Sequence, residues 1–266
     1  METFAGKTVL ISGASEGIGR ALALALAAEG ADLALNARNA ARLEDAAREC
    51  AARGARVLAL PGDISRRPEC DALVAGTVER FGRIDALINN AGITMWSRFD
   101  GLRDFSVLER LMAVNYLGAV YLTAAALPHL RRSRGLIVAV ASLAGLTGVP
   151  ERTGYAASKH ALVGFFESLR IELRGSGVDV TLIAPDFVAS EIHRRALGPD
   201  GEPLGHNPMQ PGIQPASECA ALIVAGMRAR RRLVITSARG RFMRWARVIV
   251  PALVDTVAAR AIRTRR

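Results

Sequence analysis

The sequence predicts an α/β fold of one Rossmann-type domain, in which helices cover both faces of a doubly wound parallel sheet of about seven strands. Short aliphatic runs alternate with longer Ala- and Leu-rich segments of helical period along most of the chain. This alternation is typical of right-handed βαβ crossovers, which make neighbouring strands parallel. A composition that is 50% hydrophobic but only 5% aromatic suits a buried sheet of small aliphatic side chains.

Each expected strand is a β-branched or aliphatic run bounded by helical or turn-forming residues. The strands are expected at residues 8–12, 33–36, 57–60, 86–89, 135–141, 178–184 and 233–236. Helices are expected between them, including residues 105–126 and 153–174, where apolar residues recur with helical spacing. Residues 185–216 lack a clear period and are rich in proline and glycine, so they predict a long loop that is a lid or a disordered segment.

The length of 266 residues permits one large core. Residues 1–238 are assigned to the Rossmann-type domain, with the lid at 185–216, and residues 239–266 to a basic amphipathic helical tail. The formal charge of +10 is concentrated near the end: residues 228–266 carry twelve arginines and one acid, whereas the other 227 residues sum to −1. A basic tail on a neutral body, without a nucleic-acid motif, favours contact with anionic lipid or an acidic partner over nucleic acid.

Three scattered cysteines, Cys50, Cys70 and Cys219, form no CxxC or Cys/His cluster, so neither a disulfide framework nor a metal site is expected. Unpaired cysteines fit a reducing cytoplasm. The chain runs from Met1 almost directly into the first strand, which leaves no room for a signal peptide. Its apolar stretches are interpreted as too short to span a membrane. We therefore expect a cytoplasmic protein.

A glycine-rich turn, Ser-Gly-Ala-Ser-Glu-Gly-Ile-Gly at residues 12–19, joins the first strand to the first helix. Gly13 would permit the tight turn, Gly17 the approach of a pyrophosphate to backbone N–H groups, and Gly19 the packing of helix on strand. The position at the first βα junction indicates a dinucleotide site. The alternative is that the glycines only shape the turn.

The spacing Gly-x-x-x-Gly-x-Gly resembles that of the short-chain dehydrogenase/reductase family. Asn89-Asn90-Ala91-Gly92, Asn115, Ser142 and Tyr155-x-x-x-Lys159 follow in the family's order, so the resemblance covers roughly residues 7–235. Beyond it, the tail is similar to that of some bacterial carbonyl reductases with lipophilic substrates. The resemblance implies hydride transfer between a nicotinamide cofactor and a ketone, aldehyde or alcohol. The cofactor-binding residues that it implies are Gly13, Ser15, Gly17, Ile18, Gly19, Arg38, Asp63, Ile64, Asn89, Ala91, Gly92, Tyr155, Lys159, Pro185, Val188 and Ser190.

The end of the second strand bears on the choice of cofactor. An NAD-preferring relative would carry an acid there, but this chain has Ala37 followed by Arg38. A guanidinium can bind a 2′-phosphate with two charge-assisted hydrogen bonds, so NADP(H) is expected in preference to NAD(H). The alternative is that Arg38 is a solvated start of the next helix. Glu16 departs from the basic residue that many NADP-preferring relatives have.

Tyr155 and Lys159 lie four residues apart in an expected helix and should share one face. A tyrosine hydroxyl titrates near ~10, and a nearby ammonium should lower its pKa into a useful range. The chain has only two lysines, Lys7 and Lys159, against 33 arginines. This suggests that the site at Lys159 requires a compact ammonium group that arginine could not supply. Tyr155 is thus the expected proton donor and acceptor.

Two more polar residues complete the expected catalytic set of Asn115, Ser142, Tyr155 and Lys159. Ser142 follows an expected strand, at the edge where ligands bind open α/β sheets, and its hydroxyl could bind the substrate oxygen. The resemblance implies that Asn115 holds a water in a proton relay from Lys159, and that Lys159 binds the nicotinamide ribose.

The loop after the sixth strand departs from the family pattern. Asp186 follows Pro185 where the family has glycine, and we expect its carboxylate to point to solvent because burying it is costly. Ser190 stands where the family has threonine. His193 and His206 are isolated loop histidines and are expected to be exposed and inert.

The tail places Phe242 and Trp245 among arginines, which fits a helix on a membrane surface. A dimer-interface or core-packing helix is the alternative. The expected partners are a lipophilic carbonyl or alcohol substrate, further copies of the chain in a homodimer or homotetramer, and a peripheral membrane contact, with no nucleic acid. The rival function is a catalytically silent dinucleotide-binding sensor or scaffold, since a fold does not fix a function. The intact catalytic set argues against it.

Overall fold

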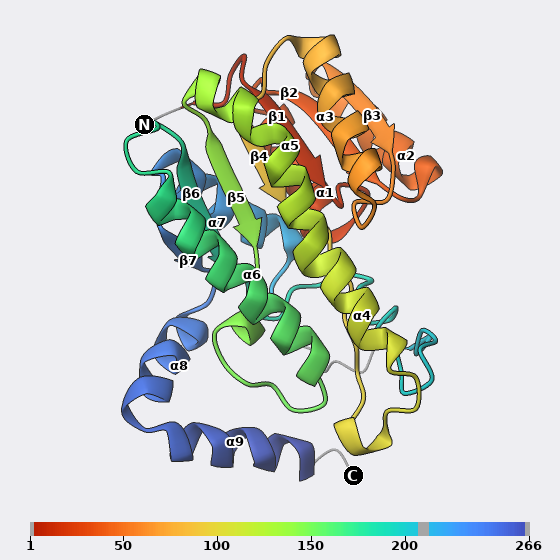
Figure 1. Ribbon diagram of the computed structural model, residues 1–266, viewed down its shortest axis with the longest axis vertical. Coiled ribbons are helices and arrows are strands. Elements are labelled where there is room, and N and C mark those ends of the chain that lie inside the picture. Colours follow the sequence, from red (N-terminus) through yellow and green to blue (C-terminus); the bar gives the residue numbers. More distant parts are fainter. Residues whose placement is uncertain (1–2, 207–212, 264–266) are drawn as a thin grey trace.

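The computed structural model of the chain describes residues 3–206 and 213–263, and it confirms the expected fold (Figure 1). Part of the expected lid, residues 207–212, and the last three tail residues lie outside this description. All strands in the sheet are parallel, in the order β3-β2-β1-β4-β5-β6-β7. Their bounds are β1 (Thr8–Ser12), β2 (Asp32–Ala37), β3 (Val57–Pro61), β4 (Ala86–Asn89), β5 (Leu136–Val140), β6 (Asp179–Ala184) and β7 (Leu233–Ile235).

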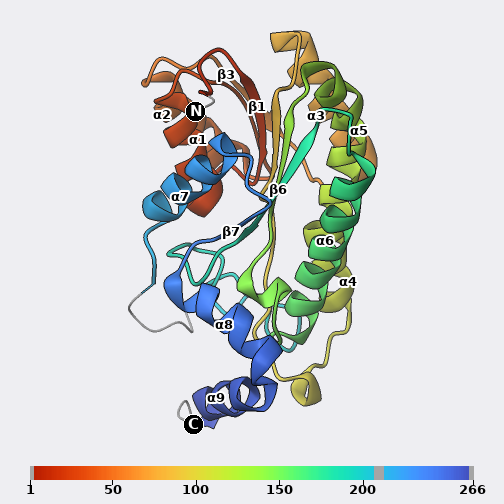
Figure 2. The same cartoon turned by 90° about the vertical axis from the view of Figure 1, so that its left-hand side faces the viewer.

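Helices cover both faces of the sheet (Figure 2). One face carries α1 (Gly17–Ala27), α2 (Ala40–Ala51) and α7 (Ala216–Arg228); the other carries α3 (Arg67–Phe81), α5 (Gly118–Ser133) and α6 (Thr153–Glu172). Alternate side chains of one strand serve the two cores: Val9 and Ile11 pack in the first, and Leu10 in the second. Such double burial explains why the strands are nearly continuous runs of apolar residues.

The strand order reverses direction between β1 and β4. The chain builds outward from β1 to β3 on one side, and then from β4 to β7 on the other. The connections after β1 and β4 therefore leave the sheet in opposite directions and open a crevice at its carboxyl edge, where open α/β sheets bind their ligands.

One helix differs from the expectation in length and apolar character. The expected helix at 105–126 is α4 (Ser106–Met112), a π-helical turn (Ala113–Leu117) and α5, which together form a continuous helix to Ser133. By length and composition this stretch could cross a membrane, contrary to the expectation that no stretch could. Within the fold, its side chains at Leu122, Ala126 and Leu130 are buried against the sheet, as in an interior helix.

The tail folds as two helices, α8 (Ala238–Ile249) and α9 (Pro251–Arg263), which extend below the carboxyl edge of the sheet (Figure 1). The short 3₁₀ turn Phe99–Gly101 lies at the same end of the molecule. Helix α8 is attached to the body through Arg247, which donates to the Leu146 carbonyl, and through Gly240, where a Cβ would lie 2.9 Å from the Leu143 side chain. The tail thus contacts the loop that follows β5.

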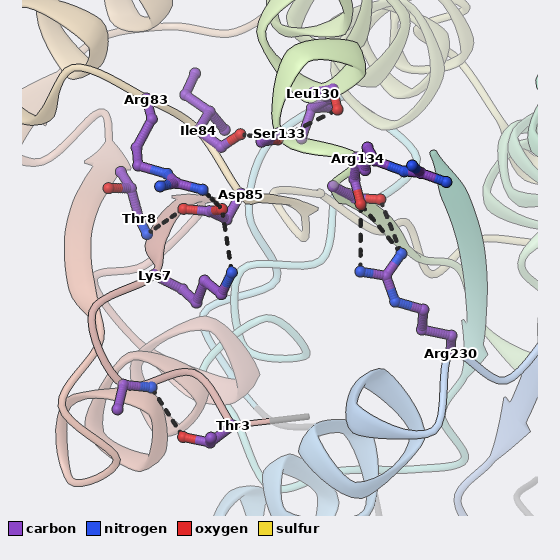
Figure 3. Close-up of polar contacts among 12 residues, drawn as sticks. Thr3, Lys7, Thr8, Arg83, Ile84, Asp85, Leu130, Ser133, Arg134 and Arg230 are labelled. Atoms are coloured by element: carbon purple, nitrogen blue, oxygen red, sulfur yellow. Dashed lines mark hydrogen bonds and ion pairs between the residues drawn. The ribbon is translucent and has the colours of Figure 1, made fainter. Parts of the chain in front are cut away.

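The opposite, amino edge of the sheet is closed by polar contacts that Figure 3 shows. The buried Asp85 carboxylate accepts hydrogen bonds from the Thr8 backbone N–H at 3.0 Å and from Arg83 Nη2 at 2.6 Å. Lys7 Nζ lies 3.7 Å from the same carboxylate. One of the two lysines therefore belongs to an ion-pair cluster that joins β1 to the segment before β4, far from the crevice.

Replacing Asp85 by alanine should lower the free energy of unfolding by about 1–3 kcal/mol, because the buried Thr8 N–H would lose its acceptor. Denaturant unfolding followed by circular dichroism measures the change. Asp45→Ala, which removes a carboxylate from an exposed helical ion pair, is the matched control and should change stability by under ~0.5 kcal/mol. Equal effects of the two substitutions would contradict this account of the amino edge.

Candidate active site

A cavity of about 560 Å³ opens at the carboxyl edge of the sheet, in the crevice where the strand order reverses. Its wall is formed by the glycine-rich turn after β1, the ends of β2 and β3, the segment after β4, the end of β5, helix α6 and the loop after β6. Most of the residues expected at the site line this one cavity. They are Gly13, Ser15, Gly17, Ile18, Arg38, Asp63, Ile64, Ala91, Gly92, Ser142, Tyr155, Lys159, Pro185, Val188 and Ser190.

Three expected site residues, Gly19, Asn89 and Asn115, lie behind the cavity wall. A Cβ at Gly19 would lie 2.1 Å from the Gly13 carbonyl oxygen, so its lack of a side chain serves the packing of α1 on the turn. Asn89 Nδ2 donates to Thr123 Oγ1 at 2.9 Å, which ties β4 to α5. Gly19 thus has the packing role expected for it, both residues shape the wall from behind, and their contact with the cofactor stays a prediction.

The glycine-rich turn fits a pyrophosphate group. Gly13 has a positive φ of 67°, and a Cβ there would lie 2.7 Å from the Ala91 Cα, so only glycine lets these two segments approach. Asn90 Nδ2 fixes the approach by donating to the carbonyls of Ser12 at 3.1 Å and Gly13 at 3.0 Å. Among the described residues no side chain caps the N-terminus of α1, which leaves its first N–H groups to bind an anion.

At the far end of the cavity, Arg38 lies exposed beside the glycine-rich turn. Glu16 also lines this end, but its carboxylate accepts from Arg42 Nη1 at 3.2 Å and is ion-paired with Arg195. Two guanidinium groups therefore offset the negative charge of Glu16. Arg195 reaches Glu16 from the loop after β6, so this ion pair also joins that loop to the glycine-rich turn.

The hydroxyl groups of Ser142 and Tyr155 and the ammonium group of Lys159 lie at the other end of the cavity. Tyr155 and Lys159 share a face of α6 as expected, and Lys159 Nζ lies 5.9 Å from the centroid of the tyrosine ring. Ser142 follows β5, lines the cavity with Tyr155, and accepts from the Ala144 backbone N–H at 3.1 Å. The structure thus brings Ser142, Tyr155 and Lys159 together.

Burial is the largest influence on the pKa values of Tyr155 and Lys159. It raises the pKa of Tyr155, and the nearby Ser142 hydroxyl and the charge of Arg152 only partly offset that rise. Burial also lowers the pKa of Lys159 to about 8. The expected net lowering of the Tyr155 pKa is not found, since burial raises it, and Lys159 Nζ donates to the Val140 carbonyl at 2.9 Å.

Asn115 lies in the π-helical turn between α4 and α5 and is almost fully buried. Its Oδ1 accepts from the Ile93 N–H at 2.8 Å, and its Nδ2 donates to the Ile93 carbonyl at 3.0 Å and to Ser158 Oγ at 2.9 Å. A Cβ at Gly92 would lie 3.1 Å from Asn115 Oδ1 and 3.5 Å from Lys159 Nζ. Asn115 therefore fixes the segment that separates it from Lys159.

Asp186 does not point to solvent, contrary to the expectation, and its side chain is only 10% exposed. Its carboxylate accepts two hydrogen bonds from Arg239, at 2.5 and 3.1 Å, and one from Ser237 Oγ at 2.7 Å. Burial would raise the pKa of Asp186, but these hydrogen bonds and the charge of Arg239 outweigh it and keep the pKa below its usual range. Asp186, which stands where the family has glycine, thus joins the loop after β6 to the start of α8.

The two loop histidines differ. His206 is exposed as expected, whereas His193 is buried, and burial with the nearby charge of Arg152 lowers its pKa to about 4. Residues that the sequence interpretation missed also line the cavity, among them Asn90 and Arg195. Asn90 could have been found, because it lies within the quoted Asn-Asn-Ala-Gly motif. Arg195 gave no signal, since 179 residues separate it from Glu16.

Comparisons with known proteins agree with this geometry. A family model described as short chain dehydrogenase matches residues 7–198. The chain is 39% identical to 11-beta-hydroxysteroid dehydrogenase 1A of Arabidopsis thaliana over 262 residues, which are 96% of this chain and 75% of that protein. It is 36% identical to an 11-beta-hydroxysteroid dehydrogenase of Pinus massoniana over 268 residues, covering 96% of this chain and 73% of that protein.

The solved structures that are similar agree in fold. A short chain dehydrogenase/reductase from Burkholderia phymatum in complex with NAD has a TM-score of 0.85 and 28% identity, covering 95% of this chain and 96% of that chain. Levodione reductase has a TM-score of 0.78 and 28% identity, covering 87% and 96% of the two chains.

Proposed function

The chain belongs to the short-chain dehydrogenase family of oxidoreductases, and on that premise we propose that it uses NADP(H) to interconvert a lipophilic ketone or aldehyde and its alcohol. The observation that carries the proposal is the convergence of Ser142, Tyr155 and Lys159 on the cavity whose other end is the glycine-rich turn. When bound, the nicotinamide would supply or accept the hydride. The protein would supply the acid–base groups, orient the substrate and exclude water.

Proton transfer is the task of Tyr155 in this proposal. Its raised pKa keeps the hydroxyl protonated at neutral pH, so it can donate a proton to the alkoxide oxygen formed on reduction. Ser142 would donate a second hydrogen bond to that oxygen. Lys159 Nζ, whose pKa burial lowers to about 8, would bind the cofactor ribose and hold charge near Tyr155. Asn115 would support the proton relay by fixing the backbone beside Lys159.

The proposed substrate class rests on the wall and on the relatives. Ile93 and Leu197, which pack in one apolar cluster with Tyr155, line the cavity together with Ile192, and these side chains would bury an apolar skeleton. The relatives named as hydroxysteroid dehydrogenases support a lipophilic ring system that carries one hydroxyl or keto group.

Tyr155→Phe should lower kcat by about 10²–10⁴-fold for any accepted carbonyl substrate, because it removes the proton donor. NADPH binding, measured by fluorescence titration, should stay within about twofold, since the phenyl ring is retained. Tyr121→Phe removes a hydroxyl from a tyrosine that packs against the core outside the cavity, and should leave turnover unchanged. A wild-type protein that binds NADPH but turns over no carbonyl compound would favour the silent sensor instead.

The preference for NADP(H) rests on Arg38 and on the paired state of Glu16. Arg38 carries the charge at the position where a 2′-phosphate would lie beyond the end of β2. Glu16 would repel that phosphate if its charge were free, but Arg42 and Arg195 both bind its carboxylate. The similar solved structure, at 28% identity, is in complex with NAD, so the preference for NADP(H) rests on Arg38, Glu16, Arg42 and Arg195 of this chain.

Arg38→Ala should weaken NADPH binding by about 10–100-fold, because it removes charge-assisted hydrogen bonds to the 2′-phosphate. NADH binding should change by less than about threefold. Arg48→Ala, at an exposed position near the other end of α2, is the matched control and should change neither. An equal loss of affinity for both cofactors, or tighter wild-type binding of NADH, would contradict the preference.

We also propose that α8 and α9 contact an anionic membrane surface. Phe242, Trp245 and Ile249 are 70%, 64% and 73% exposed, and the exposed Arg241 and Arg244 lie among them. An apolar surface ringed by arginines is complementary to acidic lipid headgroups. The alternative of core packing is not supported by such exposure, and the alternative of a dimer interface remains an outcome of the test.

Sedimentation with vesicles tests this contact. The full chain should co-sediment with vesicles of phosphatidylcholine and phosphatidylglycerol, much less with phosphatidylcholine alone, and less as salt rises. The double substitution Phe242→Ser and Trp245→Ser should weaken binding by about tenfold or more. Absence of binding at low salt, or a dimer lost in the double variant, would overturn the proposal.

A further inference from the structure

Arg152 is a buried cation at the first turn of α6, and only 5% of it is exposed. It occupies the N-cap position, where short oxygen-bearing side chains are favoured and a positive charge is disfavoured by the helix dipole. Burial of the guanidinium adds a desolvation cost. Local helix structure therefore gives no reason for arginine at this position.

The surroundings of Arg152 are aromatic. Its Cζ lies 4.3 Å from the centroid of the Trp96 ring and 5.7 Å from that of Phe187, and its Nη2 lies 3.1 Å from His193 Nδ1. The same Cζ lies 5.6 Å from the centroid of the Tyr155 ring. Residues from three segments of the chain thus hold one guanidinium beside the tyrosine that lines the cavity.

Other charged groups near Tyr155 do not replace this cation. His193 has a pKa of about 4 and is neutral at physiological pH. Lys159 Nζ lies 5.9 Å from the ring centroid, but with a pKa of about 8 it loses its charge in mildly alkaline solution. A guanidinium stays charged over the whole range.

Two charged groups lie behind the aromatic rings. Glu151 accepts a hydrogen bond from Trp96 Nε1 at 2.9 Å, and the largely exposed Arg239 lies over the Phe187 ring at 5.6 Å. Each of these charges contacts a ring other than that of Tyr155, and Arg239 is also bound to Asp186. Of the two cations that the described part of the chain places over the Tyr155 ring, Arg152 at 5.6 Å is therefore the one whose charge is permanent.

We propose that Arg152 is a positioning residue for the reaction, whose permanent charge beside the Tyr155 ring stabilises the phenolate formed when Tyr155 gives up its proton. The inference rests on the proposed role of Tyr155. Arg152 lies behind Tyr155 and His193, which line the cavity, so it acts through Tyr155 and does not bind the substrate. The cage of rings keeps water from screening this charge.

The sign of the effect follows from the charge. Loss of Arg152 destabilises the phenolate, so Tyr155 deprotonates at higher pH. Alcohol oxidation requires the phenolate as base, and its rising pH limb should therefore move to higher pH. At pH 7 the kcat/KM for oxidation should fall by about tenfold, and much of this loss should be recovered in alkaline solution.

A titration that needs no substrate tests the proposal directly. The chain contains three tyrosines, so 3,5-difluorotyrosine labelling gives few ¹⁹F resonances, and Tyr155→Phe assigns one of them. Fluorination brings the phenol titration into a range where the folded protein can be studied. The Tyr155 midpoint should lie at higher pH in Arg152→Met than in the wild type.

Arg152→Lys, which restores a cation, should return the midpoint toward the wild-type value. Arg174→Gln removes one exposed positive charge just beyond the other end of α6 and should leave the midpoint unchanged. If circular dichroism shows that Arg152→Met does not fold, Arg152→Gln keeps a donor for His193 and serves in its place. A midpoint equal to or below the wild-type value in the uncharged variant would overturn the proposal.

The oxidation profile gives the second readout. A loss of kcat that is uniform with pH in Arg152→Met would indicate a structural role alone and would also overturn the proposal. A wild-type protein without turnover would refute the proposed function, whereas the ¹⁹F titration would still decide the role of Arg152.

Discussion

The close approach of the turn after β1 to the segment after β4 is the contact on which the cavity depends. Gly13 and Ala91 are so near that a Cβ at Gly13 would lie 2.7 Å from the Ala91 backbone, and Asn90 fastens the two segments with a pair of hydrogen bonds. This contact fixes the position of the glycine-rich turn at the edge of the crevice. It also directs the chain after β4 to Gly92, beside Lys159 and Asn115, so one contact joins the two ends of the cavity.

The amino edge of the sheet carries contacts that stabilise the fold, whereas the carboxyl edge carries the residues proposed for catalysis. At the amino edge, Asp85 gathers Lys7, Arg83 and a backbone N–H into an ion-pair cluster that closes the sheet. At the carboxyl edge, buried Tyr155 and Lys159 have pKa values displaced by desolvation, an unfavourable arrangement that a structural role would not require. Lys7 thus stabilises the fold at one edge, whereas Lys159 belongs to the proposed catalytic site at the other.

Much of the fold could be predicted because the strands are nearly continuous apolar runs and the helices between them lie in the intervals that crossovers require. The Tyr155 and Lys159 pair could be predicted as well, since four residues on a helix fix their common face. Side-chain direction could not: Lys159 turns to the Val140 carbonyl, and Asp186 is buried because Arg239, 53 residues away, binds it. The burial of His193 likewise depends on Arg152 and Phe187, contacts that no local pattern encodes.

Transfer of deuterium is the most direct measurement of the central claim that this cavity carries out carbonyl reduction. The protein would be incubated with NADPH deuterated at C4 of the nicotinamide and a panel of lipophilic ketones that includes ketosteroids, and the alcohols analysed by mass spectrometry. The account predicts one deuterium on the carbinol carbon of a product that forms with wild type and not with Tyr155→Phe. Tight binding of NADPH without deuterium in any product would contradict it.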